Sequence, residues 1–324
     1  MRRRWYRRHS SKLPLPVISV GNLHWGGTGK TPLVAAIARH LTATGRRVAV
    51  LSRGYGRHAK GVHVVSTGGG PLLGPRVAGD EPVALAAELP GVAIVVGRDR
   101  YLAGRHAIER LPERPDCFVL DDGFSHVRLQ RDLDILIFPA RDPFAGGRLP
   151  PSGRLREPLA SARLASAVIL SGVEATEAGP DPPDCGNQLA RALVPYGYHG
   201  PGFTSRTREL DAVTERHQPL PADASVFLVT GIAHPIRFAE SVARLPNEIM
   251  GTLEFGDHHS YGEADLARIE SAVSDAGANW ILTTTKDYVK LLGRPATPLA
   301  HLPIRAEPEG GFWTWLDGEL EKLS

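Results

Sequence analysis

The stretch Val17-Ile-Ser-Val-Gly-Asn-Leu-His-Trp-Gly-Gly-Thr-Gly-Lys-Thr-Pro32 decides the fold of this chain. Its apolar start, residues 16–20, predicts a strand, and residues 33–41 beyond it predict a helix. Strand, glycine-rich loop, Gly-Lys-Thr and helix in this order are the layout of a P-loop. The first glycine of the common pattern would fall at His24, and a chance glycine-rich turn is the alternative. We therefore expect a site for a nucleoside triphosphate.

Each part of this loop has a physical task at such a site. Glycines leave room for backbone N–H groups to point at phosphate oxygens, and the helix that follows adds the positive end of its dipole. The Lys30 ammonium can reach the β- and γ-phosphates, and the Thr31 hydroxyl is a natural ligand for Mg²⁺. The residues expected to bind the nucleotide are Gly26, Gly27, Thr28, Gly29, Lys30 and Thr31.

The composition is that of a globular protein: of 324 residues, 42% are hydrophobic and 23% charged. Two cysteines, Cys117 and Cys185, make neither a disulfide framework nor a zinc site, which fits a reducing cytoplasm. No apolar run approaches the roughly 20 residues that cross a bilayer.

The positive charge is concentrated at the N-terminus. The first twelve residues hold six Lys and Arg and no acid, so the rest of the chain has 32 basic and 35 acidic residues. With Trp5 and Tyr6 among them, these residues suit an anionic membrane surface, and a disordered segment without a partner is an equal alternative. Nucleic acid is not expected, because no other basic stripe or RNA-binding motif is present.

Short apolar runs alternate with helix-like stretches, which predicts an α/β fold: a P-loop NTPase-like parallel sheet with helices on both faces. We expect a basic segment at 1–15, the P-loop domain at 16–175, a linker at 176–224 with a short extended pair around 188–194, and a smaller α/β domain at 225–324. The predicted strands are 16–20, 48–52, 92–96, 117–120, 133–138, 167–170, 226–230 and 280–283.

Three groups of polar residues could carry chemistry. Asp121 and Asp122 follow a strand, where a Walker B acid sits near Thr31 and a metal; a solvated turn is the alternative. Asp80 and Glu81 stand at a predicted helix start, and on this evidence alone helix capping is favoured. His258 lies in Asp257-His-His259, where a base toward a hydroxyl is chemically sensible, but a polar loop is favoured.

A fourth group is the arginines of Gly146-Gly-Arg-Leu-Pro-Pro-Ser-Gly-Arg-Leu-Arg-Glu-Pro158. Arg148, Arg154 and Arg156 on a rigid loop suit phosphate binding, because the planar guanidinium matches phosphate oxygens two at a time. Solvated surface arginines are the even alternative.

The ordered set of these motifs resembles the tetraacyldisaccharide 4′-kinase family, the lipid A 4′-kinases of Gram-negative bacteria. The P-loop stretch is followed by Ser-Arg-Gly-Tyr-Gly, Gly-Asp-Glu-Pro, Asp-Asp-Gly-Phe-Ser-His, Arg-Asp-Leu-Asp-Ile, the arginine loop, Asp-His-His and Thr-Thr-Lys-Asp. Each motif alone is weak, but their order over residues 16–291 is highly specific.

The resemblance implies transfer of the γ-phosphate of ATP, with Mg²⁺, to the 4′-hydroxyl of a tetraacylated glucosamine disaccharide 1-phosphate. It implies that Lys30 and Thr31 hold phosphate and metal, and that Glu81, Asp121 and Asp122 act around Mg²⁺. Asp80 and His258 would be the base dyad, which reverses the reading from the residues alone. Arg53, Tyr55 and Arg148 would lie near the substrate. The enzyme would work on the cytoplasmic face of the inner membrane; the oligomeric state does not follow.

Two positions depart from the family pattern. The family usually has Gln where Ser125 stands, which leaves the role of this position open. Family members usually begin with an apolar segment that seats the enzyme on the membrane, whereas this chain starts with the Arg-rich segment, so we expect weaker, salt-sensitive membrane association.

Two other functions are weighed against this one. A P-loop GTPase or metal-delivery switch would need Asn-Lys-x-Asp, which Thr284-Thr-Lys-Asp287 does not match in spacing, or a Cys/His cluster. A divergent kinase on the same scaffold could use another acceptor.

Overall fold

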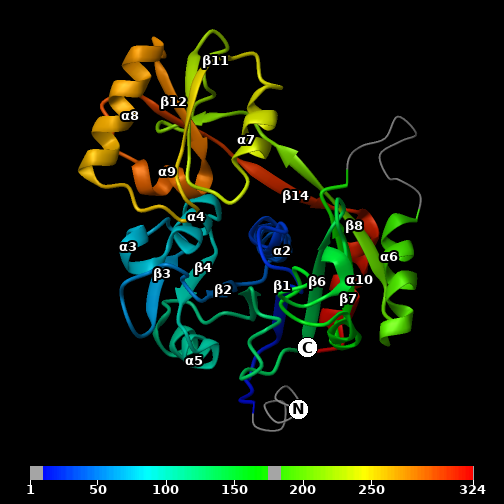
Figure 1. Cartoon of the computed structure of the whole chain (residues 1–324). Helices are drawn as coiled ribbons and strands as arrows, with labels where there is room; N and C mark the ends of the chain where they lie inside the picture. The colour runs from blue at the N-terminus through cyan, green and yellow to red at the C-terminus, as the bar shows by residue number, and fades with distance from the viewer. Residues whose placement is uncertain (1–9, 174–183, 324) are drawn as a thin grey trace.

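The computed structural model describes residues 10–173 and 184–323 (Figure 1). Most of the predicted basic segment, with Trp5 and Tyr6, lies outside the described residues, as does the Pro-rich part of the predicted linker.

The larger sheet is built around β1 (Val17–Asn22), the strand that leads into the glycine-rich loop. Within the described residues it has nine strands in the order β14-β8-β7-β6-β1-β5-β2-β4-β3. From β8 to β4 every neighbouring pair is parallel, and only the edge strands β3 and β14 run antiparallel to their neighbours. The strands are β2 (Val48–Ser52), β3 (His63–Thr67), β4 (Ala93–Val96), β5 (Cys117–Asp121), β6 (Leu133–Pro139), β7 (Ala167–Ser171), β8 (Gly202–Glu209) and β14 (Ile304–Pro308).

Helices cover both faces of this sheet, as predicted. Alternate strand residues enter different apolar clusters: Val48 and Val50 pack on the face of α2 (Lys30–Ala43), Ala49 and Leu51 on the opposite face. Beside α2 lie α4 (Asp80–Glu88) and α10 (Gly310–Glu321), while α5 (Arg100–Arg110) and α6 (Cys185–Leu193) cover the other face. The shorter elements are α3 (Pro75–Ala78), η1 (Ala145–Gly147), η2 (Leu159–Leu164) and η3 (Val194–Tyr196).

The second unit has its own five-stranded sheet within the described residues, ordered β11-β10-β12-β13-β9, and lies above the P-loop end of the first sheet (Figure 1). Apolar clusters fill both of its faces, with α8 and α9 on one and α7 on the other. Its elements are β9 (Val213–Thr214), β10 (Ser225–Thr230), α7 (Pro235–Val242), β11 (Glu248–Glu254), α8 (Glu263–Ala276), β12 (Trp280–Thr284), α9 (Thr285–Leu291) and β13 (Leu299–Leu302).

The chain between and after the two units differs from the expected ranges. The extended pair expected around 188–194 is wrong: these residues form the end of α6 and η3, because Leu189 and Leu193 are buried at helical spacing. Strand β8, inside the expected linker, extends the larger sheet, and β14 and α10 return to that sheet after the second unit. The second unit is therefore inserted between two adjacent, antiparallel strands, β8 and β14.

Candidate active site

The glycine-rich loop is held at the end of β1 by side chains from the sheet. The Asn22 amide donates to the Thr28 hydroxyl at 2.7 Å, and the Ser171 hydroxyl at the end of β7 donates to the Thr28 carbonyl at 2.9 Å. Gly29 precedes α2 with φ 84°, a left-handed conformation that favours glycine. The loop thus ends where the N-terminal N–H groups of α2 are free to bind an anion.

His24, which stands where the common pattern has glycine, has a structural place. It is buried at 4% exposure, its ring lies edge-on to Phe138, and its backbone pairs with Leu155. The start of the loop is therefore tied to the arginine-bearing segment rather than free to wrap a phosphate.

The two acids predicted for the Walker B position lie at the end of β5, beside the P-loop, but in different surroundings. Asp122 accepts two hydrogen bonds from Arg156, at 3.0 and 2.7 Å, and its Oδ1 lies 3.8 Å from the Lys30 Nζ. Burial works to raise the pKa of Asp122, but Arg156 and Lys30 outweigh it and the pKa lies below its ordinary value. Asp122 also has φ 52°, a strained backbone for a non-glycine residue.

Asp121, by contrast, is 3% exposed and receives a hydrogen bond from the Ser52 hydroxyl at 3.4 Å. Burial, followed by the negative charge of Glu81, raises the pKa of Asp121 to about 7. Burial also lowers the pKa of Lys30. A buried carboxylate that is short of positive charge is a suitable place for a cation.

The start of α4 faces the second unit. Gly79, not Asp80, is the N-cap, and no side chain caps the helix, so the capping role favoured from the residues alone is wrong. Instead the Asp80 Oδ2 lies 2.8 Å from the His258 Nδ1, and Lys286 donates to Glu81. The pair implied by the resemblance is thus in contact across the two units.

The hydrogen bond to Asp80 is the main cause that raises the pKa of His258. For Asp80 itself burial acts upward, but the His258 hydrogen bond and charge, together with Lys286 and Lys290, leave the pKa lowered. Both shifts have one physical meaning: the Asp80 carboxylate stabilises a proton on the His258 imidazole, which strengthens the imidazole as a proton acceptor. His258 has φ 58°, so its backbone is strained like that of Asp122.

Of the residues expected near the substrate, Tyr55 joins the site and Arg148 does not. The Tyr55 ring is 59% exposed, with its centroid 5.0 Å from that of His258. Arg53 is exposed on the same loop and lies within electrostatic range of the buried Arg100. Arg148 is exposed on the segment after η1, which borders a pocket that Arg154 lines.

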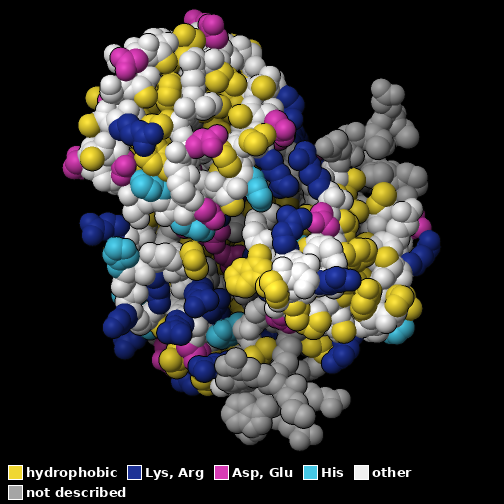
Figure 2. Space-filling view, viewed as in Figure 1, with side chains coloured by type: hydrophobic (Ala, Val, Ile, Leu, Met, Phe, Trp, Pro, Cys, Tyr) yellow, Lys and Arg dark blue, Asp and Glu magenta, His cyan; other side chains and the backbone are white. Residues whose placement is uncertain are grey.

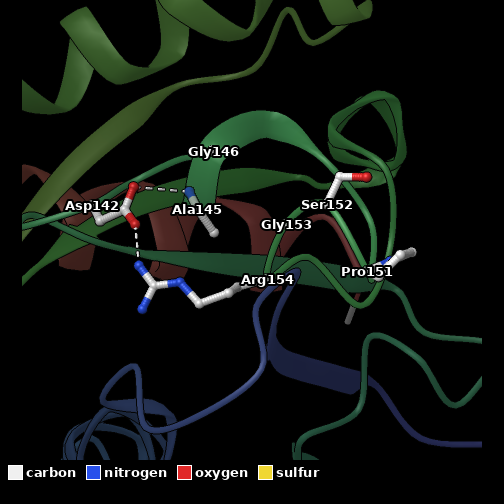
Figure 3. Close-up of a pocket in the computed structure, with 7 residues that line it drawn as sticks. All are labelled: Asp142, Ala145, Gly146, Pro151, Ser152, Gly153 and Arg154. Carbon is white, nitrogen blue, oxygen red and sulfur yellow. Dashed lines mark hydrogen bonds and ion pairs between the residues drawn. The ribbon is translucent and has the colours of Figure 1, made fainter.

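That pocket, of about 450 Å³, is lined by residues 142–154 of the arginine-bearing segment (Figure 3). Arg154 points at Asp142 across its wall, and the Arg154 carbonyl accepts from the Trp25 N–H at 3.0 Å. Of the three arginines, only Arg156 therefore contacts the Walker acid. Ser125, the other departure, donates to Glu157 at 2.8 Å.

Sequence reasoning missed the residues that hold the site together. Asn22 and Ser171 fix the loop, and Lys286 and Lys290 reach Asp80 and Glu81 from α9. A signal existed for α9, since Lys286 and Lys290 are four residues apart and share a helix face. Figure 2 shows acidic and histidine side chains gathered where the two units meet, with Lys and Arg beside them.

Comparison with known proteins shows the family of the chain. The family model Tetraacyldisaccharide-1-P 4′-kinase matches residues 1–321. Tetraacyldisaccharide 4′-kinases of Geobacter metallireducens and Syntrophus aciditrophicus are 44% and 40% identical, over 86% and 94% of this chain and 80% and 83% of theirs.

A solved structure shares the whole fold. LpxK from Aquifex aeolicus, in complex with ATP, matches with a TM-score of 0.76 and 31% identity over 99% of this chain and 93% of its own. The resemblance seen in the sequence is confirmed, and the chain belongs to the tetraacyldisaccharide 4′-kinase family.

Proposed function

We propose that this protein transfers the γ-phosphate of ATP to the 4′-hydroxyl of a tetraacylated glucosamine disaccharide 1-phosphate, a lipid A precursor. The observation that carries the proposal is the Asp80–His258 contact at 2.8 Å, because it sets a proton-accepting pair next to a P-loop. Glu81 links the two halves, since its charge acts both on Asp121 of the P-loop sheet and on Lys286 of α9.

The phosphate-donor half is the loop from Gly26 to Thr31. In this proposal the N–H groups of the loop and of the start of α2 bind phosphate oxygens, and Lys30 counters the charge that develops during transfer. Lys30 and Arg156 both contact Asp122, so these two cations lie together at the site, where they are proposed to bind the phosphates of ATP.

The acceptor half is the pair Asp80 and His258. A hydroxyl placed at the imidazole loses its proton to the pair as the bond to phosphorus forms, and Asp80 stabilises the imidazolium that results. Arg53 and Tyr55 are proposed to orient the sugar head group, because both are exposed on the loop that borders His258. Arg148 is a weaker candidate for binding the 1-phosphate of the acceptor, which is remote from the 4′-hydroxyl.

The donor set fits Mg²⁺. No cluster of three or more His, Cys, Asp or Glu arranged for a metal occurs in the part of the chain that the structure describes. A P-loop site needs none, since Mg²⁺ keeps waters and phosphates as most of its ligands. The buried Asp121 carboxyl is the observation that favours a cation here, with Asp122 and Glu81 as charged neighbours. The Thr31 hydroxyl is proposed as a further ligand. When bound, Mg²⁺ supplies charge neutralisation for the triphosphate.

We also propose that the protein works at the cytoplasmic face of the inner membrane, bound at its periphery through the basic N-terminal residues. No helix among the described residues is long and apolar enough to span a bilayer. Sedimentation with vesicles of anionic lipid tests this proposal: binding should weaken as salt rises, because exposed charges are screened beyond about 8 Å at physiological ionic strength. Binding that ignores ionic strength would contradict it.

The activity itself is tested with γ-labelled ATP, Mg²⁺ and the disaccharide 1-phosphate. Label should appear in a bisphosphorylated lipid, and Lys30→Ala and Asp80→Ala should each abolish it. Lys322→Ala, a change at an exposed lysine of the C-terminal end, is the matched control and should leave the rate unchanged. Full activity in Lys30→Ala would remove the mechanism, and label in a different acceptor would identify a divergent kinase.

A further inference from the structure

Helix α9 brings two cations of the second unit to the two acids of the α4 start. Its Lys286 donates to Glu81, and its Lys290 lies 3.8 Å from the Asp80 Oδ2. The first contact is half exposed, whereas the second is enclosed: the Lys290 side chain is 9% exposed and that of Asp80 6%. The two lysines are therefore in different physical situations.

Contacts within the second unit hold the Lys290 side chain independently of Asp80. Its Nζ lies 2.8 Å from the Asp287 Oδ1, donates to the His259 carbonyl at 3.0 Å and lies 5.3 Å from the centre of the Tyr261 ring. A lysine held by three partners loses little further conformational entropy when a fourth arrives. The Lys290 ammonium is thus already in position to pair with the Asp80 carboxylate.

Asp287, the anchor of Lys290, also holds the loop that carries His258. It is fully buried and accepts hydrogen bonds from the Gly231 N–H at 2.8 Å and the Thr284 hydroxyl at 2.9 Å. The carbonyl of the same Gly231 accepts from the His258 N–H at 3.0 Å. A Cβ on Gly231 would stand 3.0 Å from the Asp287 Oδ1, so this approach depends on glycine.

The result is a closed ring of contacts through both units. It runs from Asp80 to Lys290, from Lys290 to Asp287, through Gly231 to His258 and back to Asp80. The ring also accounts for the strained φ of 58° at His258, since the hydrogen bond to Gly231 holds the residue in that conformation.

We propose that Lys290, anchored by Asp287, is a positioning residue that holds the Asp80 carboxylate in register with His258. The inference rests on the proposed role of the Asp80–His258 pair. The Asp80 Oδ1 is occupied by the Glu81 N–H at 2.9 Å, so the Oδ2 alone faces both His258 and Lys290. Without the ammonium, the Oδ2 keeps one hydrogen bond across the interface, the one to the His258 imidazole.

The contact of Lys286 distinguishes the positioning role of Lys290 from simple attachment of the two units. Its ion pair with Glu81 spans the same interface and does not involve Lys290. Loss of Lys290 therefore leaves one bridge between α4 and α9 in place, and the expected defect is in the geometry of Asp80 rather than in the association of the units.

The first experiment compares Lys290→Met with Lys322→Met in the full chain. We expect kcat to fall about 10- to 100-fold, the range seen when a group that orients a ligand or catalytic side chain is removed, with KM for ATP changed less than about threefold. Lys322→Met should match the wild type. A kcat within about twofold of the wild type in Lys290→Met would overturn the proposal, and an equal loss carried by KM would assign Lys290 to nucleotide binding instead.

The second experiment removes the effect of stability. Lys290→Met leaves the buried Asp287 carboxylate without its cation, so the urea midpoint of this variant should fall. Lys290→Met with Asp287→Asn removes both charges and should restore much of the midpoint. We expect kcat to stay low in the double variant, because Asp80 still lacks its cation. Recovery of kcat together with stability would show a purely structural role and refute the inference.

A cycle with Asp80→Asn gives the independent check. In this background Lys290 has no carboxylate to orient, so adding Lys290→Met should change the residual kcat by less than about twofold. A full second loss would contradict the proposal. If the wild type itself transfers no phosphate, the proposed function is wrong. The comparisons among variants cannot give that result, so the two failures can be told apart.

Discussion

The clearest physical prediction concerns Asp121, because its carboxyl is nearly neutral in the fold and ionised when unfolded. Its pKa is about 7 in the structure against an ordinary value of 3.8. Ionising such an acid is harder in the folded than in the unfolded state, so its ionisation lowers the free energy of unfolding. This loss is absent below pH 3.8 and grows as the pH rises toward 7. Asp121→Asn removes this cost, so the variant should gain stability over the wild type as the pH rises.

The size of the gain follows from the two pKa values. At 1.36 kcal/mol per pKa unit, the cost of ionising Asp121 is about 1.7 kcal/mol at pH 5 and about 4.3 kcal/mol at pH 8.5. The gap in unfolding free energy between Asp121→Asn and the wild type should therefore widen by about 2.7 kcal/mol between these pH values. Any constant effect of the amide on packing cancels in that difference.

The assay is urea unfolding of the two proteins at pH 5 and pH 8.5, with EDTA and without nucleotide, since a bound cation would neutralise Asp121. Glu321→Gln, at an exposed position just before the C-terminus, is the control and should show a gap that does not change with pH. A gap for Asp121→Asn that is flat or that narrows toward pH 8.5 would refute the reasoning. The same variant should lose phosphate transfer, so stability and activity should move in opposite directions.

Three further outcomes follow from single contacts. Gly79→Ala should be inactive and less stable by about 1–3 kcal/mol in urea, because Gly79 has φ 96° and a Cβ there would meet the Tyr55 carbonyl at 2.8 Å. Arg156→Lys should lower kcat about tenfold or more in the transfer assay, since an ammonium cannot make both hydrogen bonds to Asp122. Ser171→Ala should raise the KM for ATP several-fold with kcat nearly unchanged, because the loop carbonyl that it holds becomes free to move; an unchanged KM would show that the loop is set by Asn22 alone.

The first half of the fold could be predicted from the sequence because its strands are mostly apolar. Strands β1, β2 and β5 are buried on both faces, so their runs of apolar residues are nearly continuous, and the glycine loop marks the end of β1. Strand β8 escaped prediction because its second half leaves the core, so that its residues 206–209 are polar and partly exposed. The return of β14 and α10 to the first sheet has no local signal at all, since it depends on pairing with β8 about 100 residues earlier.

The site residues also fall into a group that the sequence predicts and a group that it does not. Lys30, Thr31, Asp121 and Asp122 follow strands of one sheet, so topology alone gathers them. Asp80 and His258 are 178 residues apart and lie on different units, and their local sequences favoured a helix cap and a loop. Only the resemblance could pair them. It included Asp287 in the Thr-Thr-Lys-Asp motif but gave neither Asp287 nor Lys290 a role, because their contacts become visible only in the structure.

The insertion of the second unit between β8 and β14 determines where the two units are joined by the chain and where only by contacts between side chains. Both connections to the larger sheet leave from neighbouring strands at one edge, while the Asp80–His258 and Glu81–Lys286 contacts lie at the start of α4, which packs against β3 and β4 toward the other edge. The unit is therefore fixed covalently on one side of the P-loop, and on the other by ion pairs together with the Tyr55–His258 ring contact and the packing of Val289 on the first core. Covalent strands keep the unit aligned with the sheet, and ion pairs between carboxylates and cations are the contacts that a phosphate-bearing substrate can enter and rearrange. The groups that bridge the units thus include the Asp80–His258 pair proposed for phosphoryl transfer, so in this proposal the same pair takes part in catalysis and in joining the two units.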